Sequence, residues 1–308
     1  MNDEDLLRRI EEIDDELIEE GVEPWRRQLG VEGRLAKELR ISYQINSGPN
    51  QPHHVHMLRE FYGTYYSEED FYMPPAYVGS FLFRDIFFPI RIPRIFGSPP
   101  ITPATFLGNA KPSQRAKIFG EKELAVPFFD QVFDLFDFVY GLDDAWKMGK
   151  LSDKPVEMWH LAKQQLEAAA AVTLVSLSKD AVVQNCCVAV ELLLKGALIA
   201  TGTDQRMMSN GRLGYGHNLP SLAEKACESN PGIQKSLLLD TIGRFPDYVH
   251  TRYNFARLSR VKLGRLLMDS QFIAGEVLRQ FSGRNLRNDF AAEGYRHERL
   301  YPLFILPG

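Results

Sequence analysis

The first twenty residues carry a single apolar stripe at helical spacing. Leu6, Ile10, Ile13 and Leu17 recur at steps of four and three residues, which places them on one face of an α-helix. The pattern predicts a helix over residues 2–20. The same stretch has ten acidic residues and two arginines. Two interpretations follow: a docking helix for a basic protein partner, or a solvated helix packed on its own protein.

The pattern changes after residue 41, where glycine, proline and aromatic residues replace the helical period. Residues 89–95 alternate as an exposed strand does, but the two prolines of this segment lack the N–H that a central strand donates. We therefore expect an edge strand or an extended wrap. Helical spacing returns after Pro127, which fits the first turn of a helix. Residues 1–150 are predicted to form an α+β or irregular, Pro- and aromatic-rich region of unknown family.

Helical periodicity dominates from residue 151, and an all-helical bundle is expected over residues 151–285, so the chain is predicted to be mostly α. The helix predicted over residues 180–200 is apolar on almost all sides, which marks it as the central helix of the bundle. Within it, Glu191 and Lys195 lie one turn apart and are expected to pair, with Glu191 as a structural polar residue. The tail, residues 286–308, is expected to pack on the body. Helices are predicted over residues 157–176, 180–200, 219–228, 233–242 and 266–281.

The composition is that of a globular protein, with 44% apolar and 25% charged residues. The net charge of -4 argues against a broad nucleic-acid-coating surface, but it leaves room for a local basic patch. The three cysteines have no zinc spacing and indicate small core residues in a reducing compartment. No phosphate-binding loop is present, and His53, His54 and His56 have no second ligand cluster, so no metal or cofactor is predicted. We expect a cytoplasmic protein without a membrane segment.

Three motifs, in order, resemble the HEPN family of helical domains. They are the stretch Ala189–Leu198 with its Glu and Lys, the stretch Gly216–Leu219 before a short helix, and the stretch Arg252–Asn254. The third is similar to the Arg-Tyr-Pro element of one branch, with Asn in place of Pro. The resemblance covers about residues 155–282. It implies an antiparallel helical bundle, RNA or nucleotide chemistry, a homodimer and, by analogy, a setting in bacterial stress or phage defence.

Many HEPN domains are metal-independent ribonucleases with an arginine followed, four to six residues later, by a histidine. A base must take the ribose 2′-hydroxyl proton and a cation must stabilise charge on the phosphate, which suits these two residue types. Arg244 and His250 have this spacing. Phe245 stands where a polar residue is usual, Pro246 interrupts the segment, and alignment with the Arg-Tyr-Pro branch puts Arg252 at the motif position instead. The candidate catalytic residues are therefore Arg244, His250 and Arg252.

The resemblance and the charge distribution also give candidates for RNA or nucleotide binding. These are Lys195, His217, Arg257 and Arg260. Residues 241–300 contain eleven basic and six acidic residues, which favours an anionic ligand. The alternative is that this basic stretch pairs with the acidic N-terminal helix. Three functions remain open: an RNA- or nucleotide-associated module, an active metal-independent endoribonuclease, and a non-catalytic protein-interaction scaffold.

Overall fold

The chain folds as a mostly helical protein with one small sheet, seen here in a computed structural model. Its two compact units are Met1–Pro74 and Pro75–Gly308. The boundary that we expected at residues 150–153 falls inside the second unit instead, because the helices on either side of it pack on each other. The structure describes residues 2–41, 52–97, 102–149, 151–175, 179–209, 214–247 and 258–292.

The first unit is built on the apolar stripe of the N-terminal helix. Helix α1 (Asp3–Glu19) confirms the predicted helix, and the side chain of Asn2 caps it by accepting from the Asp5 N–H at 2.8 Å. The apolar stripe is buried against helices α2 (Pro24–Leu39) and α3 (His53–Tyr65). A short 3-10 turn, η1 (Glu68–Phe71), follows α3.

Part of the acidic surface of α1 is paired inside the first unit. Arg34 of α2 donates to Glu16 at 2.8 Å and to Glu20 at 2.6 Å, and Arg9 of α1 holds Glu38 through two hydrogen bonds of 2.9 and 2.6 Å. Exposed pairs of this kind contribute little stability each. They do agree with the interpretation of α1 as a solvated helix packed on its own unit.

The second unit begins with a β-hairpin that we expected only in part. Strands β1 (Tyr77–Phe83) and β2 (Ile86–Ile92) pair antiparallel, with Ser80 opposite Pro89. Arg84 has φ 58°, a left-handed conformation that a two-residue hairpin turn requires. Pro89 donates no hydrogen bond, but its carbonyl accepts from the Gly108 N–H at 3.0 Å, so an adjoining segment uses the edge of β2.

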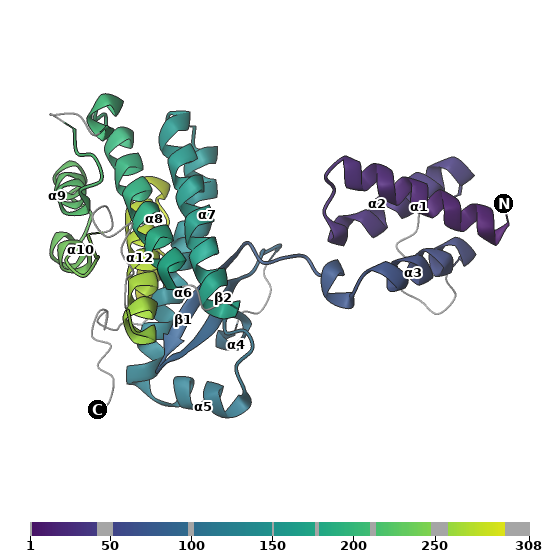
Figure 1. Ribbon diagram of the computed structural model, residues 1–308, viewed down its shortest axis with the longest axis horizontal. Coiled ribbons are helices and arrows are strands. Elements are labelled where there is room, and N and C mark those ends of the chain that lie inside the picture. Colours follow the sequence, from purple (N-terminus) through teal and green to yellow (C-terminus); the bar gives the residue numbers. More distant parts are fainter. Residues whose placement is uncertain are drawn as a thin grey trace. The chain divides into compact units, whose positions relative to one another are not determined.

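The helices of the second unit follow the hairpin, and four of them form its central bundle (Figure 1). Those four are α6 (Lys122–Lys147), α7 (Asp153–Val175), α8 (Lys179–Ala200) and α12 (Arg260–Ser282). Around them lie α4 (Pro103–Phe106), α5 (Pro112–Gly120), η2 (Gln205–Met208), α9 (Leu219–Ser229), α10 (Lys235–Ile242) and α13 (Leu286–Ala292).

Two details of this bundle correct the sequence-based expectation. Helix α6 begins at Lys122, so Pro127 lies inside the helix and not in its first turn, because a turn containing the buried Val126 precedes it. The bundle is also not antiparallel throughout. Helix α12 runs parallel to α6, with Met268 beside Gln131 and Arg279 beside Asp137. The long connection between α8 and α12 includes α9 and α10. It brings the chain back to the end of the bundle at which α6 begins, so α12 can run parallel to α6.

A buried amide network joins the hairpin to the bundle. The Gln271 side chain of α12 accepts from the Ser80 N–H at 2.9 Å and donates to the Ser80 carbonyl at 3.0 Å and to Gln131 Oε1 at 2.5 Å. Gln131 in turn donates to the Met268 carbonyl at 3.2 Å. Buried amides left unpaired would cost free energy, so this network fixes the position of β1 against α6 and α12.

The predicted C-terminal tail is described only in its first part. Helix α13 packs on α6, where the Phe290 ring lies 5.3 Å from the Phe133 ring and the Leu286 N–H donates to Asp137 at 2.9 Å. Residues 293–308 lie outside the described residues.

Helix α8 is the most apolar helix of the described chain. Its stretch Ala181–Ala200 is long and apolar enough to cross a membrane by composition, but 72% of that window is buried inside the protein. Packing of α8 on α7, α9 and α12 accounts for its composition as that of a core helix, which agrees with the prediction from sequence.

Helices α6 and α12 approach so closely at Gly275 that a side chain has no room there. A Cβ atom added to Gly275 would lie 2.6 Å from the Asp134 carbonyl oxygen and 2.7 Å from its Cα. We expect Gly275→Ala to lower the free energy of unfolding by about 2–3 kcal/mol, because backbone atoms must separate. Urea unfolding followed by circular dichroism measures this. The control is Gly120→Ala, where an added Cβ meets nothing within 4 Å. Equal stability of the two variants would contradict the close contact.

Candidate functional site

A carboxylate sits in the middle of the central helix. Glu191 of α8 is buried, and Lys195 lies one helical turn further on and is buried as well. The Lys195 ammonium donates to Glu191 Oε1 at 2.7 Å. This confirms the predicted pairing of the two residues.

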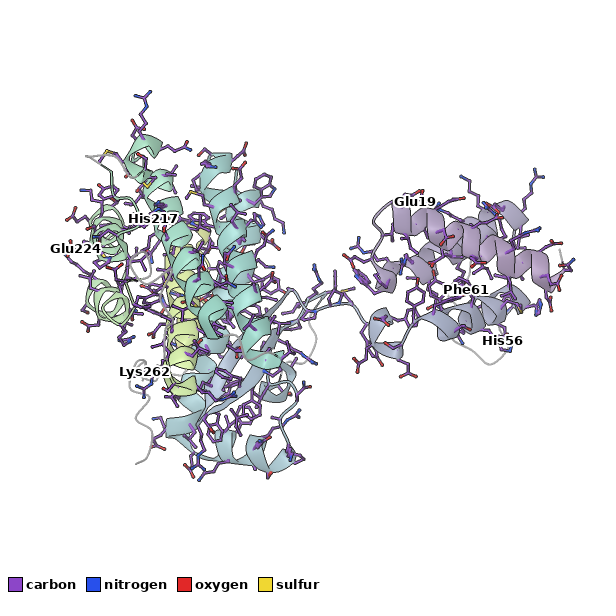
Figure 2. All side chains as sticks on the ribbon, in the orientation of Figure 1. Glu19, His56, Phe61, His217, Glu224 and Lys262 are labelled. Carbon is purple, nitrogen blue, oxygen red and sulfur yellow. The ribbon has the colours of Figure 1, made fainter. Side chains whose placement is uncertain are left out.

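The second carboxylate oxygen of Glu191 contacts a residue from a different part of the chain. His217 Nδ1 lies 2.8 Å from Glu191 Oε2, and 34% of the His217 side chain is exposed. His217 precedes α9, and Figure 2 labels it close to α8 and α9. We call Lys195, Glu191 and His217 the Glu191 centre. Both oxygens of one carboxylate are thus shared between a buried ammonium and a partly exposed imidazole.

Local sequence explains how His217 reaches α8. Gly216 has φ 57°, a conformation that glycine adopts without steric cost, and it turns the chain just before the histidine. Asn218 then caps α9, because its side chain accepts from the Ser221 N–H at 2.9 Å. The imidazole therefore lies between a turn and a helix cap.

The chemistry open to the Glu191 centre follows from this geometry. A buried carboxylate that contacts one ring nitrogen orients the imidazole. An imidazole held in this way can act as a proton acceptor or donor, or contact an anion such as a phosphate. Lys195 offsets the carboxylate charge, so the centre does not leave a buried anion unpaired.

Arg244, a candidate catalytic residue, connects two helices. It follows α10, and its guanidinium makes two hydrogen bonds to Asp269 of α12, at 3.0 and 2.9 Å. It also donates to the Asp240 carbonyl at 3.1 Å and to Thr241 Oγ1 at 3.2 Å. The described contacts therefore show Arg244 as a link between α10 and α12. The other two catalytic candidates, His250 and Arg252, lie outside the described residues, as does Arg257.

Arg260, a candidate for RNA binding, contacts the hairpin. Its Nε donates to the Asp85 carbonyl at 3.0 Å, and its guanidinium carbon lies 5.1 Å from the centre of the Phe87 ring. These contacts hold the hairpin against the start of α12. The structure therefore brings together three of the predicted site residues, Glu191, Lys195 and His217, and gives Arg244 and Arg260 contacts elsewhere.

A second buried ionic cluster was not predicted. Arg279 of α12 donates to Asp134 at 2.6 Å and to Asp137 at 2.7 Å, both on α6, and to Glu276 at 3.2 Å. Burial raises the pKa of Asp137, and the charge of Arg279 opposes that shift. A sequence signal existed, since acidic residues recur at helical spacing within the Phe-rich α6. This cluster links α12 to α6.

No site for a metal ion is evident among the described residues, where no three potential ligand side chains come together. The histidines near position 53 belong to α3 and not to a strand or loop. His53 Nε2 lies 2.8 Å from Asp3 Oδ1 on the exposed surface of the first unit.

The pairing inside the Glu191 centre can be tested by a double-mutant cycle. We expect Lys195→Met to lower the free energy of unfolding by about 3 kcal/mol, because it keeps the aliphatic stem and leaves a buried carboxylate with one partner fewer. Adding Glu191→Gln should recover part of that loss, since the amide carries no charge. Denaturant unfolding of the two single variants and the double variant measures the coupling. Strictly additive losses would show that the two side chains do not interact.

The comparisons with known proteins leave the chain without an assigned family. No family model, curated protein or solved structure matches it. The resemblance to HEPN domains therefore depends on the motifs in the sequence alone.

Proposed function

We propose that the second unit is a HEPN-like, RNA- or nucleotide-associated module that meets its ligand at the Glu191 centre. The observation that carries the proposal is a buried carboxylate shared between Lys195 and the partly exposed His217. A structural ion pair between Glu191 and Lys195 needs no third group. The additional contact holds an imidazole at the surface, where a ligand can reach it.

The arrangement of the motifs supports this proposal. Glu191 and Lys195 belong to one sequence motif and His217 to another, and 26 positions separate Glu191 from His217. Nothing in the helical periodicity of the chain requires these two motifs to touch. Their contact is what a shared site predicts, since a site needs groups from several segments at one place.

The charge distribution also supports an anionic ligand for the second unit. Residues 75–308 contain 28 basic and 23 acidic residues, whereas residues 1–74 contain 8 basic and 17 acidic residues. A net positive unit attracts phosphates, and a net negative one repels them. The ligand is therefore proposed for the second unit alone. A homodimer and a setting in bacterial stress or phage defence are further parts of the proposal, taken from the resemblance.

Binding of labelled single-stranded RNA, followed by fluorescence anisotropy at low and high salt, tests the proposal. We expect salt-sensitive binding that weakens about tenfold in His217→Ala, the loss typical of one hydrogen bond to a charged group. His56→Ala is the matched control, because His56 is exposed on the first unit and should leave affinity unchanged. Absence of binding, or equal binding by the two variants, would refute the proposed role of His217.

Metal-independent RNA cleavage is the second candidate function. Its support is Arg244, whose guanidinium is held by Asp269 and is still about one-third exposed, as a preorganised phosphate-stabilising cation would be. If this candidate holds, labelled RNA is cut in the presence of EDTA, and His250→Ala abolishes the cutting. Arg244→Lys keeps the charge, loses the two-pronged contact and is expected to slow cleavage at least tenfold. Cleavage that EDTA stops, or that His250→Ala leaves intact, would rule out this mechanism.

The third candidate, a protein-interaction scaffold, predicts a different result in the same experiments. The protein would neither retain nor cut RNA, and a basic protein would co-purify with it through α1. Glu12 and Glu16 of α1, and Glu20 directly after it, already pair with Arg9 or Arg34, which reduces the charge left for such a partner. RNA association is therefore the function that the described contacts favour.

A further inference from the structure

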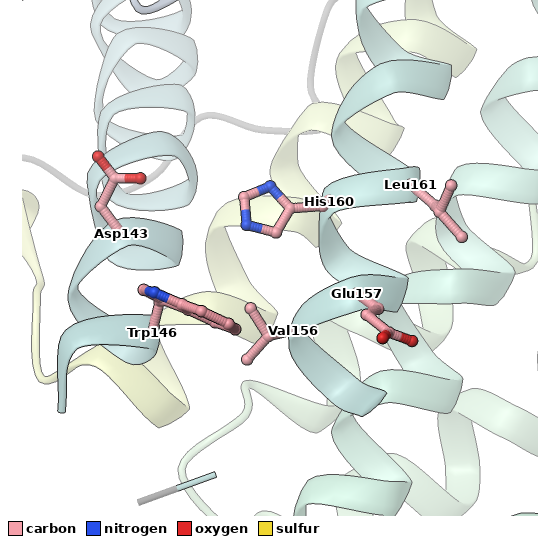
Figure 3. Close-up of a pocket in the computed structure, with 6 residues that line it drawn as sticks. All are labelled: Asp143, Trp146, Val156, Glu157, His160 and Leu161. Carbon is pink, nitrogen blue, oxygen red and sulfur yellow. The ribbon is translucent and has the colours of Figure 1, made fainter. Parts of the chain in front are cut away.

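A second place on the second unit has the features of a small-molecule site. Helices α6 and α7 meet near the short connection between them, and a cavity of about 660 Å³ opens at this corner (Figure 3). That volume lies within the range of sites that hold small organic ligands. The residues that line the cavity are Asp143, Trp146, Val156, Glu157, His160 and Leu161.

The inner surface of this cavity is apolar and aromatic. Figure 3 shows the Trp146 indole, the Val156 side chain and the His160 imidazole directed into the same space between the helices. Val156 is buried, whereas Trp146 is 56% exposed. An indole left more than half exposed beside a hollow retains much apolar area that a ligand could cover. Trp146 therefore gives the cavity an exposed aromatic surface, and Val156 gives it an apolar floor.

The rim of the cavity contains two carboxylates. Asp143 lies three residues before Trp146 on α6, and Glu157 lies next to Val156 on α7. Lys154 contacts Glu157 at 3.3 Å in an exposed pair. Within the described part of the chain no base forms an ion pair with Asp143, whereas its neighbour Asp144 is paired with Arg284 at 2.5 Å. The rim thus has an exposed carboxylate that forms no ion pair among the described residues.

We propose that this cavity binds a small organic cation with an apolar, aromatic body. The cationic nitrogen would lie over the Trp146 ring, where the negative face of the indole attracts it, and near the carboxylate of Asp143. The body of the ligand would rest on Val156, beside the His160 ring. An anionic ligand such as an RNA phosphate would meet the carboxylates of the rim, so this site is separate from the proposed RNA function and does not depend on it.

The test uses two probes with a similar aromatic body and opposite charge. Benzyltrimethylammonium and phenylacetate are titrated into the full-length protein, with its tryptophans labelled with ¹⁵N. The Trp146 indole signal is assigned by its loss in Trp146→Phe, and Trp25 and Trp159 serve as internal references. We expect the ammonium probe to shift the Trp146 signal saturably, with a Kd of about 1 mM, as is usual for a ligand of this size. Phenylacetate should leave the signal in place.

The role of Asp143 is tested by a matched pair of variants. Asp143→Asn should weaken binding of the ammonium probe about threefold, the effect of one exposed charge interaction. Glu224→Gln removes an exposed carboxylate on α9 and should leave the affinity unchanged. Equal shifts of Trp146 with both probes would overturn the charge preference, and no saturable shift with the ammonium probe up to about 20 mM, well above the expected Kd, would overturn the site. Unchanged affinity in Asp143→Asn would overturn the contribution of that carboxylate.

Discussion

A carboxylate inside the most apolar helix of the described chain constrains much of the second unit. Glu191 has little access to water, so its charge must be met by neighbouring groups. Lys195 supplies one partner from the same helix, and His217 supplies another from the turn before α9. The second contact requires the loop before α9 to lie against α8. The need to pair the Glu191 charge therefore positions α9 against α8 and, at the same time, places the His217 imidazole at the surface.

Buried polar groups are also paired at two other helix contacts of the chain. Arg279 holds the acids of α6 against α12, and in the first unit Asp14 accepts hydrogen bonds from the hydroxyls of Tyr62 and Tyr66 at 2.5 and 3.0 Å. Burial and the bond to Asp14 raise the pKa of the Tyr62 hydroxyl, so it stays protonated and continues to donate. Apolar stripes alone allow helices to slide past each other. Buried polar groups restrict the register further, because a shift would separate paired groups and leave a buried charge without its partner.

Periodicity in the sequence predicted α1, α7, α8, α9, α10 and the later part of α12, and the helical spacing in α6 after Pro127, together with the pairing of Glu191 with Lys195. It did not predict α2 and α3, where charged and aromatic residues weaken the apolar pattern, or β1, whose run of apolar residues has no alternation. The parallel direction of α12 depends on a long connection, and its close approach to α6 depends on Gly275; no local pattern reveals either feature. The contact of His217 with Glu191 joins distant segments, so only the family resemblance, and not spacing, indicated that both belong to one site.

The central claim is that His217, oriented by Glu191, is the group that meets an RNA or nucleotide ligand. The most direct measurement is a two-dimensional ¹H–¹⁵N spectrum of the histidine rings, recorded while single-stranded RNA is added at low salt. The account predicts a saturable change in the His217 ring signals, reversed by added salt, with the His56 signals unchanged. RNA that binds without altering the His217 ring, or that shifts His217 and His56 alike, would contradict the account.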